Sequence, residues 1–124
     1  MKISEIKVLI CDDSVLVRKK LADILKTAGI TEIAEAKDGV QAVEQFKANN
    51  PDLTFMDIVM PEKTGIEALE EIKQYNPAAK IVMASTIGTQ SNLTAAIKAG
   101  AFDFLQKPVQ EEDIYKILNT FTKE

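Results

Sequence analysis

Five short apolar runs recur along this chain, and each is followed by a segment whose apolar residues have helical spacing. The runs cover residues 8–11, 32–36, 53–56, 81–84 and 102–105 of the 124 residues. Such an alternation of strand and helix favours a parallel sheet with right-handed crossovers between its strands. The sequence therefore predicts one α/β domain, spanning residues 1–124, with five strand–helix units.

Capping residues indicate where the helices begin and end. Ser14 is placed to cap the first helix, and Gly29 is placed to end it. Two further helix starts have the spacing of a capping box: Asp38 with Gln41, and Thr64 with Glu67. A fourth helix is expected over about residues 90–99. The fifth carries an apolar stripe at helical spacing: Ile114, Ile117, Leu118 and Phe121.

The polarity of the five runs predicts the strand order. Runs one, three and four are almost wholly apolar, as expected for strands that helices cover on both faces. Runs two and five are interrupted by Glu32, Glu35 and Asp103, which suits the edges of a sheet. The flavodoxin-like order 2-1-3-4-5 meets both conditions. It also places a ligand crevice beyond the carboxyl ends of strands one and three.

Polar residues at the ends of the runs converge on that crevice. Asp12 and Asp13 end run one and Asp57 ends run three, while Ser85 and Lys107 follow runs four and five. Three neighbouring carboxylates repel one another unless a cation neutralises them. Oxygen ligands of this kind suit Mg²⁺, with Mn²⁺ as a second candidate. A carboxylate beside a metal ion and an ammonium group predicts a site that binds a phosphoryl group and attacks it.

The composition argues against several other classes of site. A net charge of −4 and a pI near 4.9 argue against nucleic-acid binding, and the basic triplet Arg18-Lys19-Lys20 is interpreted as a solvated helix face. The chain has no histidine, which excludes His-based triads and the usual zinc sites. Its single cysteine, Cys11, is interpreted as a core residue. Because the chain lacks the apolar core of a signal peptide and any span-length apolar stretch, we expect a cytoplasmic protein without membrane insertion.

At these residues the chain resembles the receiver domain of bacterial response regulators, and the resemblance covers essentially the full length. It rests on an ordered set of pieces: Asp12-Asp13, Asp57 within Met56-Asp57-Ile58-Val59-Met60-Pro61, Gly65, Ser85, Ala99-Gly100-Ala101, Phe104 and Lys107-Pro108. The resemblance implies that Asp57 is the phospho-acceptor. It also implies a metal site made of the following groups: Asp12, Asp13, Asp57 and the backbone carbonyl of Val59.

The resemblance assigns roles to residues from the last two strands as well. Lys107 is expected to contact the acyl phosphate, and the Lys107-Pro108 bond is expected to be cis. Ser85 is the expected switch hydroxyl, with its neighbour Thr86 as a weaker candidate. Phe104 is the expected switch aromatic, although burial in the core would explain it equally well.

The family implies a signalling switch rather than an enzyme, with intrinsic autophosphorylation and autodephosphorylation chemistry. A sensor histidine kinase would donate the phosphoryl group, and the face of helix four, strand five and helix five would then change shape. Because the chain ends soon after the fifth helix, we expect no output domain. The output would be the binding of a protein target, such as a flagellar motor switch component in chemotaxis, with a phosphatase as a further partner. The alternative is a phosphorelay intermediate or phosphate sink that passes the phosphoryl group to a histidine phosphotransfer protein.

Two departures from relatives affect this expectation. Phe104 lacks the hydroxyl group of the tyrosine that several chemotaxis relatives carry at that position. Val59 and Ile87 are apolar where relatives have polar or acidic groups that orient the hydrolytic water. The sequence therefore predicts slow self-dephosphorylation unless an outside phosphatase supplies the missing group.

Two other classes share part of this chemistry or architecture. Phosphatases of the haloacid-dehalogenase type use an aspartyl nucleophile and Mg²⁺, but their two aspartates lie one residue apart, whereas Asp12 and Asp13 are adjacent. A flavin-binding domain has the same architecture, but acidic residues at the crevice would repel the flavin phosphate. Both classes are therefore weaker interpretations than a receiver domain.

Overall fold

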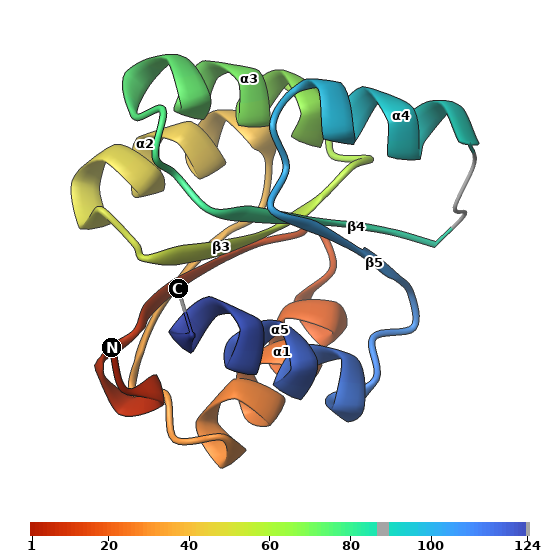
Figure 1. Ribbon diagram of the computed structural model, residues 1–124. Helices are drawn as coiled ribbons and strands as arrows, with labels where there is room; N and C mark the ends of the chain where they lie inside the picture. The colour runs from red at the N-terminus through yellow and green to blue at the C-terminus, as the bar shows by residue number, and fades with distance from the viewer. Residues whose placement is uncertain (87–89, 124) are drawn as a thin grey trace.

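Five parallel strands form one sheet in the order β2-β1-β3-β4-β5, which confirms the predicted order (Figure 1). The computed structural model describes residues 1–86 and 90–123. The strands are β1 (Lys7–Cys11), β2 (Glu32–Ala36), β3 (Leu53–Asp57), β4 (Ile81–Ser85) and β5 (Asp103–Gln106). The helices are α1 (Val15–Thr27), α2 (Gly39–Asn49), α3 (Gly65–Tyr75), α4 (Gln90–Lys98) and α5 (Glu111–Thr122), and a short 3-10 turn, η1 (Ile3–Glu5), precedes β1.

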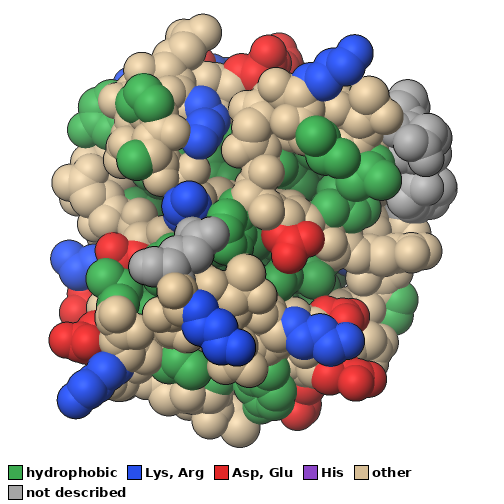
Figure 2. All heavy atoms as spheres, viewed as in Figure 1, with side chains coloured by type: hydrophobic (Ala, Val, Ile, Leu, Met, Phe, Trp, Pro, Cys, Tyr) green, Lys and Arg blue, Asp and Glu red, His purple; other side chains and the backbone are tan. Residues whose placement is uncertain are grey.

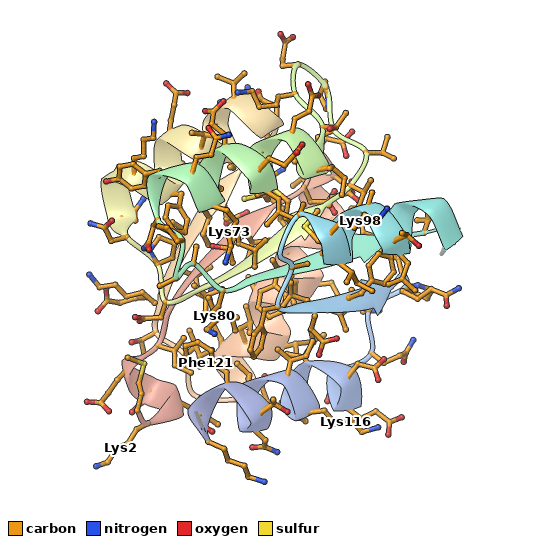
Figure 3. The ribbon with its side chains drawn as sticks, turned by 45° about the horizontal axis from the view of Figure 1, so that its top comes forward. Lys2, Lys73, Lys80, Lys98, Lys116 and Phe121 are labelled. Atoms are coloured by element: carbon orange, nitrogen blue, oxygen red, sulfur yellow. The ribbon has the colours of Figure 1, made fainter. Side chains whose placement is uncertain are left out.

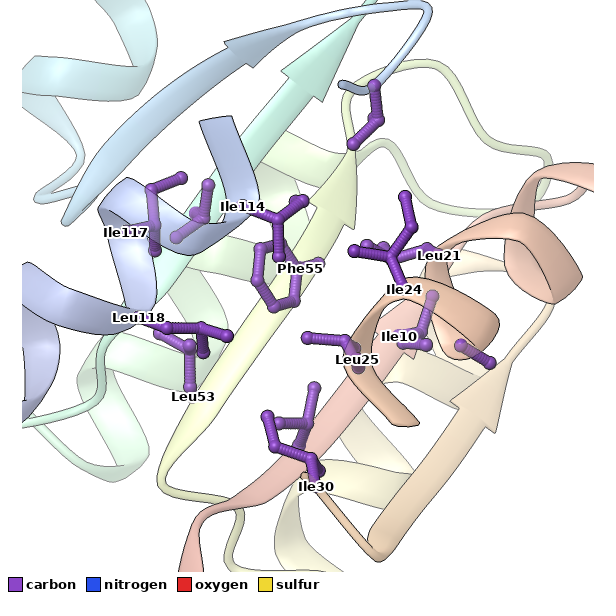
Figure 4. Close-up of a cluster of buried hydrophobic side chains, with 14 of the residues drawn as sticks. Ile10, Leu21, Ile24, Leu25, Ile30, Leu53, Phe55, Ile114, Ile117 and Leu118 are labelled. Atoms are coloured by element: carbon purple, nitrogen blue, oxygen red, sulfur yellow. The ribbon is translucent and has the colours of Figure 1, made fainter. Parts of the chain in front are cut away.

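Helices cover both faces of the sheet. α1 and α5 lie on one face, and α2, α3 and α4 lie on the other (Figure 1). Alternate strand residues enter the two layers, so Ile10 and Phe55 pack with α1 and α5 (Figure 4), whereas Leu9 and Met56 pack on the opposite side. Every residue of β3 and β4 is buried, whereas β2 buries only Ala36. This difference agrees with the predicted central and edge positions.

The predicted caps determine the starts of three helices. The Ser14 side chain accepts a hydrogen bond from a backbone N–H in the first turn of α1. Thr64 and Glu67 form a complete capping box at α3, with bonds of 3.2 and 3.0 Å. Asp38 accepts from the Gln41 N–H at 2.8 Å, but the Gln41 side chain accepts from the residue before Asp38. The box at α2 is therefore only half formed.

Two aromatic rings, one directly before β5 and one near the end of α5, pack against each other. The rings of Phe102 and Phe121 meet edge to face with 6.3 Å between their centroids. The Lys80 ammonium lies 5.3 Å from the centroid of the Phe102 ring, on the same side of the molecule as Phe121 (Figure 3). Phe121, the last residue of the predicted apolar stripe, is half-buried. The other three residues of the stripe are fully buried: Ile114, Ile117 and Leu118.

Charged side chains are dispersed over the face of the molecule shown in Figure 2. On the face shown in Figure 2, Lys and Arg side chains are separated by acidic, apolar and uncharged groups. Some of them have local roles, as when Lys73 donates to the carbonyl oxygens of Pro77 at 2.7 Å and Ala79 at 3.2 Å (Figure 3). Across residues 1–86 and 90–123, the helices are too short or too polar to cross a membrane.

Candidate functional site

The sheet face that packs against α1 and α5 becomes charged where its strands end. On three strands that apolar face leads, with a period of two, to a charged residue: Ile10 to Asp12, Phe55 to Asp57, and Leu105 to Lys107. Val17 and Leu21 of α1 line the same narrow cavity as the three charged residues. The first turns of α1 therefore form one wall of the site.

Three carboxylates meet at this edge. Asp12, Asp13 and Asp57 can each place an oxygen atom within 4.8 Å of the other two. Asp12 and Asp57 are nearly buried, with 3% and 7% of their surface exposed, whereas Asp13 is exposed. The structure thus brings together the three acids that the sequence places at the crevice. A cluster with two buried carboxylates and one open to solvent suits a hard cation that keeps part of its water shell.

Lys107 lies between two of these acids. Its ammonium group pairs with Asp12 and lies 3.2 Å from Oδ1 of Asp57, and its side chain is 10% exposed. The Ser14 N–H donates to Oδ1 of Asp12 at 2.9 Å. When every group is ionised, three negative charges face one positive charge, so a net charge of about −2 remains. A divalent cation would balance that charge.

Burial raises the pKa of the Asp57 carboxyl group, and the nearby charge of Asp12 raises that pKa further. The Lys107 ammonium acts in the opposite direction and only partly offsets the shift. Burial lowers the pKa of Lys107, but its hydrogen bonds and charge interactions with Asp12 and Asp57 outweigh burial and raise it overall. Lys107 therefore stays charged, and a cation beside Asp57 would favour the ionised carboxylate.

Close backbone packing fixes the loop between β3 and α3. A Cβ on Gly65 would lie 1.9 Å from the carbonyl oxygen of Asp57, so only glycine allows this approach. On the other side of the loop, a Cβ on Gly39 would lie 2.0 Å from the carbonyl oxygen of Lys63. The first residues of α2 and α3 thereby hold the segment that carries Val59. Sequence reasoning included Gly65 but missed Gly39, for which its place directly after a cap residue was the available signal.

The two candidate switch residues lie on the neighbouring strands. Ser85 is buried, and its carbonyl oxygen accepts the Lys107 N–H at 2.8 Å, so the two residues are adjacent across β4 and β5. Phe104 is half-buried against the core layer of α2, α3 and α4. Thr86 is exposed and lines an apolar groove that also contains Lys107. Ile87, named above as a flank of the phosphoryl site, lies outside the described residues.

The Lys107-Pro108 peptide bond is cis, as expected. Cys11 is buried, and burial, reinforced by Asp12, raises the pKa of its thiol group, which confirms that it is a core residue rather than a reactive one.

Arg18 is not the solvated residue that the sequence predicted. Its side chain is 15% exposed, and its guanidinium group donates to the carbonyl oxygen of Asp12 at 2.6 Å and to Glu35 at 2.8 Å. Lys19, the next residue, is exposed and pairs with Asp23 along the helix surface. The prediction was wrong for Arg18 because an arginine can bury its stem and still reach a backbone carbonyl, which composition does not reveal.

Comparison with known proteins decides the family. Residues 8–119 match the family model of the response regulator receiver domain. The chain belongs to the response regulator receiver family. It is 47% identical to the chemotaxis protein CheY of Bacillus subtilis over 113 residues, which are 91% of this chain and 94% of that protein. It is 44% identical to CheY of Thermotoga maritima over 117 residues, which are 94% of this chain and 98% of that protein.

Solved receiver structures share the architecture. The CheX-CheY-BeF3-Mg complex from Borrelia burgdorferi contains a chain with a TM-score of 0.89 and 32% sequence identity, and the match covers 94% of this receiver and 89% of that chain. Membership of the family makes this receiver a phosphorylation-activated signalling domain, homologous to chemotaxis regulators, rather than a conventional enzyme.

Proposed function

We propose that Asp57 accepts a phosphoryl group from a phosphohistidine of a sensor kinase and that the acyl phosphate activates the domain for chemotaxis signalling. The observation that carries this proposal is the nearly buried carboxylate of Asp57, which lies within 4.8 Å of two other acids and 3.2 Å from the Lys107 ammonium. A structural ion pair alone would need one acid. The surplus negative charge is the signature of a site for a cation and a transferred anion.

The transfer forms one bond and breaks one bond. A carboxylate oxygen of Asp57 attacks phosphorus, the P–N bond to the kinase imidazole breaks, and the imidazole leaves with the bonding electron pair. Mg²⁺, held by Asp12, Asp13, Asp57 and the Val59 carbonyl, would neutralise charge on the phosphoryl oxygens. Lys107 is already positioned beside Asp57 to contact the same oxygens. Mn²⁺ has the same preference for oxygen ligands and is a second probe of the site.

The phosphoryl group becomes a signal through the residues beside Lys107. Because Ser85 adjoins Lys107 across the sheet, its hydroxyl is the group that would donate to a phosphoryl oxygen. That bond would draw in the end of β4, and half-buried Phe104 would then complete its burial. The face of α4, β5 and α5 would change shape for a protein target. The phosphoryl group adds about two negative charges at Asp57. For such a population shift, the new charge-assisted hydrogen bonds would have to favour the active state by several kcal/mol.

The proposed partners follow from relatives. A histidine kinase would supply the phosphoryl group, and the target would be a flagellar motor switch component or a similar protein. The Borrelia burgdorferi receiver is seen with CheX and Mg, which supports a metal site and a regulatory partner, such as a phosphatase, for this receiver as well. We further propose that residues 1–124 act in the cytoplasm as a receiver domain. A phosphorelay intermediate with the same chemistry is the alternative.

Incubation with acetyl phosphate and Mg²⁺, followed by intact-mass analysis, tests the proposal. One added phosphoryl group is expected on the unchanged protein and none on Asp57→Asn. Asp23→Asn is the matched control because Asp23 is exposed on α1, away from the cluster. Chelation of the metal should abolish loading. If Asp57→Asn carries a base-labile adduct as the unchanged protein does, Asp57 is not the acceptor.

Pull-down with phosphorylated and unphosphorylated protein separates the two signalling roles. Capture of a motor-switch protein only in the phosphorylated state would support the chemotaxis role. Transfer of the label to a histidine phosphotransfer protein would support the phosphorelay alternative.

A further inference from the structure

Arg18 joins three elements at the edge of the acidic cluster. It lies at the end of the first turn of α1, and its side chain is largely covered. Nη1 donates to the carbonyl oxygen of Asp12 at 2.6 Å, and Nε donates to Oε1 of Glu35, on β2, at 2.8 Å. A single planar guanidinium group thus links α1, β2 and the loop that follows β1.

The main chain of Asp12 is fixed at both of its polar groups. Its N–H donates to the carbonyl oxygen of Ala36 at 3.0 Å, and its carbonyl oxygen accepts from Arg18. Since the peptide unit is planar, the direction of the Asp12 carbonyl also sets the direction of the Asp13 N–H and the position of the Asp13 Cα atom. Arg18 therefore holds the backbone from which two of the three acids project, and its printed hydrogen bond is to the Asp12 carbonyl oxygen rather than to a carboxylate of the cluster.

We propose that Arg18 is a positioning residue for the metal site: it holds the Asp12–Asp13 peptide so that both carboxylates face the cation, and Glu35 holds the guanidinium in place. The inference rests on the proposed function, because it requires that the acids bind Mg²⁺. Arginine suits this role because its rigid fork bonds two acceptors at once, which a lysine ammonium on a flexible stem does less well.

The charge of Arg18 and its positioning role predict opposite effects on metal binding. A positive charge near a cation site opposes binding, so loss of charge alone would tighten Mg²⁺ binding slightly. Loss of a group that orients a metal ligand weakens binding, typically by tenfold or more. The sign of the change in the dissociation constant therefore distinguishes the two roles.

Calorimetric titration with Mg²⁺ alone tests the inference on the unphosphorylated protein. Arg18→Met is expected to raise the dissociation constant about tenfold. Lys19→Met, which removes the same charge from the exposed neighbour, is expected to leave it unchanged or slightly lower. Arg18→Lys should retain part of the affinity. Equal constants for Arg18→Met and Lys19→Met would overturn the inference.

Two substitutions of Glu35 keep the test decisive if Arg18→Met does not fold. Glu35→Gln and Glu35→Ala remove the same charge, but only glutamine keeps an oxygen that can accept from Nε. The inference expects weaker Mg²⁺ binding in Glu35→Ala than in Glu35→Gln. It also expects larger shifts of the Asp12 and Asp13 amide NMR signals in Glu35→Ala. Identical behaviour of the two would contradict it. If the unchanged protein does not bind Mg²⁺, the proposed function fails together with this inference. If the unchanged protein binds Mg²⁺ and the variants bind it with the same affinity, only this inference is rejected.

Discussion

On one face of the sheet, the interior of β3 is apolar, whereas the carboxyl end of β3 is charged. Phe55 is 2% exposed and packs in the apolar layer with α1 and α5, while Asp57, two residues later, is 7% exposed among like charges. Burial stabilises the fold at the first position, but at the second it raises the pKa of a carboxylate. Stability and function are therefore separated along one strand over two residues.

The largest effect is expected in the interior. Phe55→Ala should lower the free energy of unfolding by about 3–5 kcal/mol, because it removes a buried ring and leaves a cavity. Urea denaturation followed by circular dichroism measures this loss. The fraction that remains folded should still load phosphate at Asp57. If the variant keeps its stability but its folded fraction no longer loads phosphate, then stability and function are not separated along β3.

Gly65 lies where the two regions meet, so its substitution should affect both. Gly65→Ala places a Cβ 1.9 Å from the Asp57 carbonyl oxygen, and the shift needed to relieve that clash should cost about 2 kcal/mol. It should also weaken Mg²⁺ binding, because the Asp57 backbone must move. Gly29→Ala is the control: Gly29 has a φ of 108°, so alanine is strained there, but a Cβ would meet no atom within 4 Å. Loss of stability without loss of Mg²⁺ binding is expected in the control. The same result for Gly65→Ala would contradict the coupling.

An exposed residue at the carboxyl end should change a rate without changing stability. Val59 is 70% exposed beside Asp57 and offers no polar group to a hydrolytic water. Val59→Asn should speed loss of phosphate about tenfold, which corresponds to about 1.4 kcal/mol of activation free energy. Mass analysis over time after removal of acetyl phosphate measures the rate. Ile97→Asn, at a similarly exposed aliphatic residue on α4, is the control and should leave the rate unchanged.

Asp57→Asn should stabilise the metal-free protein by about 1 kcal/mol at neutral pH, because it removes a buried negative charge that lies near the negative charge of Asp12. The folded pKa of Asp57 is raised above its unfolded value, so the ionised carboxylate destabilises the fold. The cost is absent below the unfolded pKa, grows as the pH rises through the folded pKa, and is complete above it. The stability advantage of the variant should follow the same course in chelator-treated samples. Addition of Mg²⁺ should stabilise the unchanged protein and reduce the difference. An advantage that is greatest at low pH would contradict the assignment.

The sequence predicted most of the fold because its signals were local. Run polarity identified the central and edge strands, and Ser14 and Thr64 marked the starts of their helices. The acidic cluster was predictable because parallel strands end at one edge of a sheet. These inferences needed only side-chain type and order.

Features that depend on tertiary distance were not predictable in this way. The contact of Arg18 with Asp12 joins residues from different elements, and a basic triplet on a helix gives no sign of it. The approach of Gly39 to Lys63 joins the start of α2 to the loop before α3. In both cases a backbone carbonyl is the partner, and every residue carries one, so the sequence does not mark it.

The smallest effect concerns a polar atom inside the apolar region. Among the described residues, the hydroxyl of Thr54 has no hydrogen-bond partner, and the residue is 0% exposed. Thr54→Val should stabilise the fold by about 0.5–1 kcal/mol, since a buried hydroxyl is replaced by a methyl group of similar volume. Thr54→Ser keeps the hydroxyl, loses a methyl group and should destabilise the fold by about 1 kcal/mol. Neither should change Mg²⁺ binding, because Thr54 lies three residues before Asp57 on β3 and its side chain is on the opposite face of the sheet. If Thr54→Val destabilises the protein, the hydroxyl has a partner, and the interior of β3 is less purely apolar than the contrast with Asp57 requires.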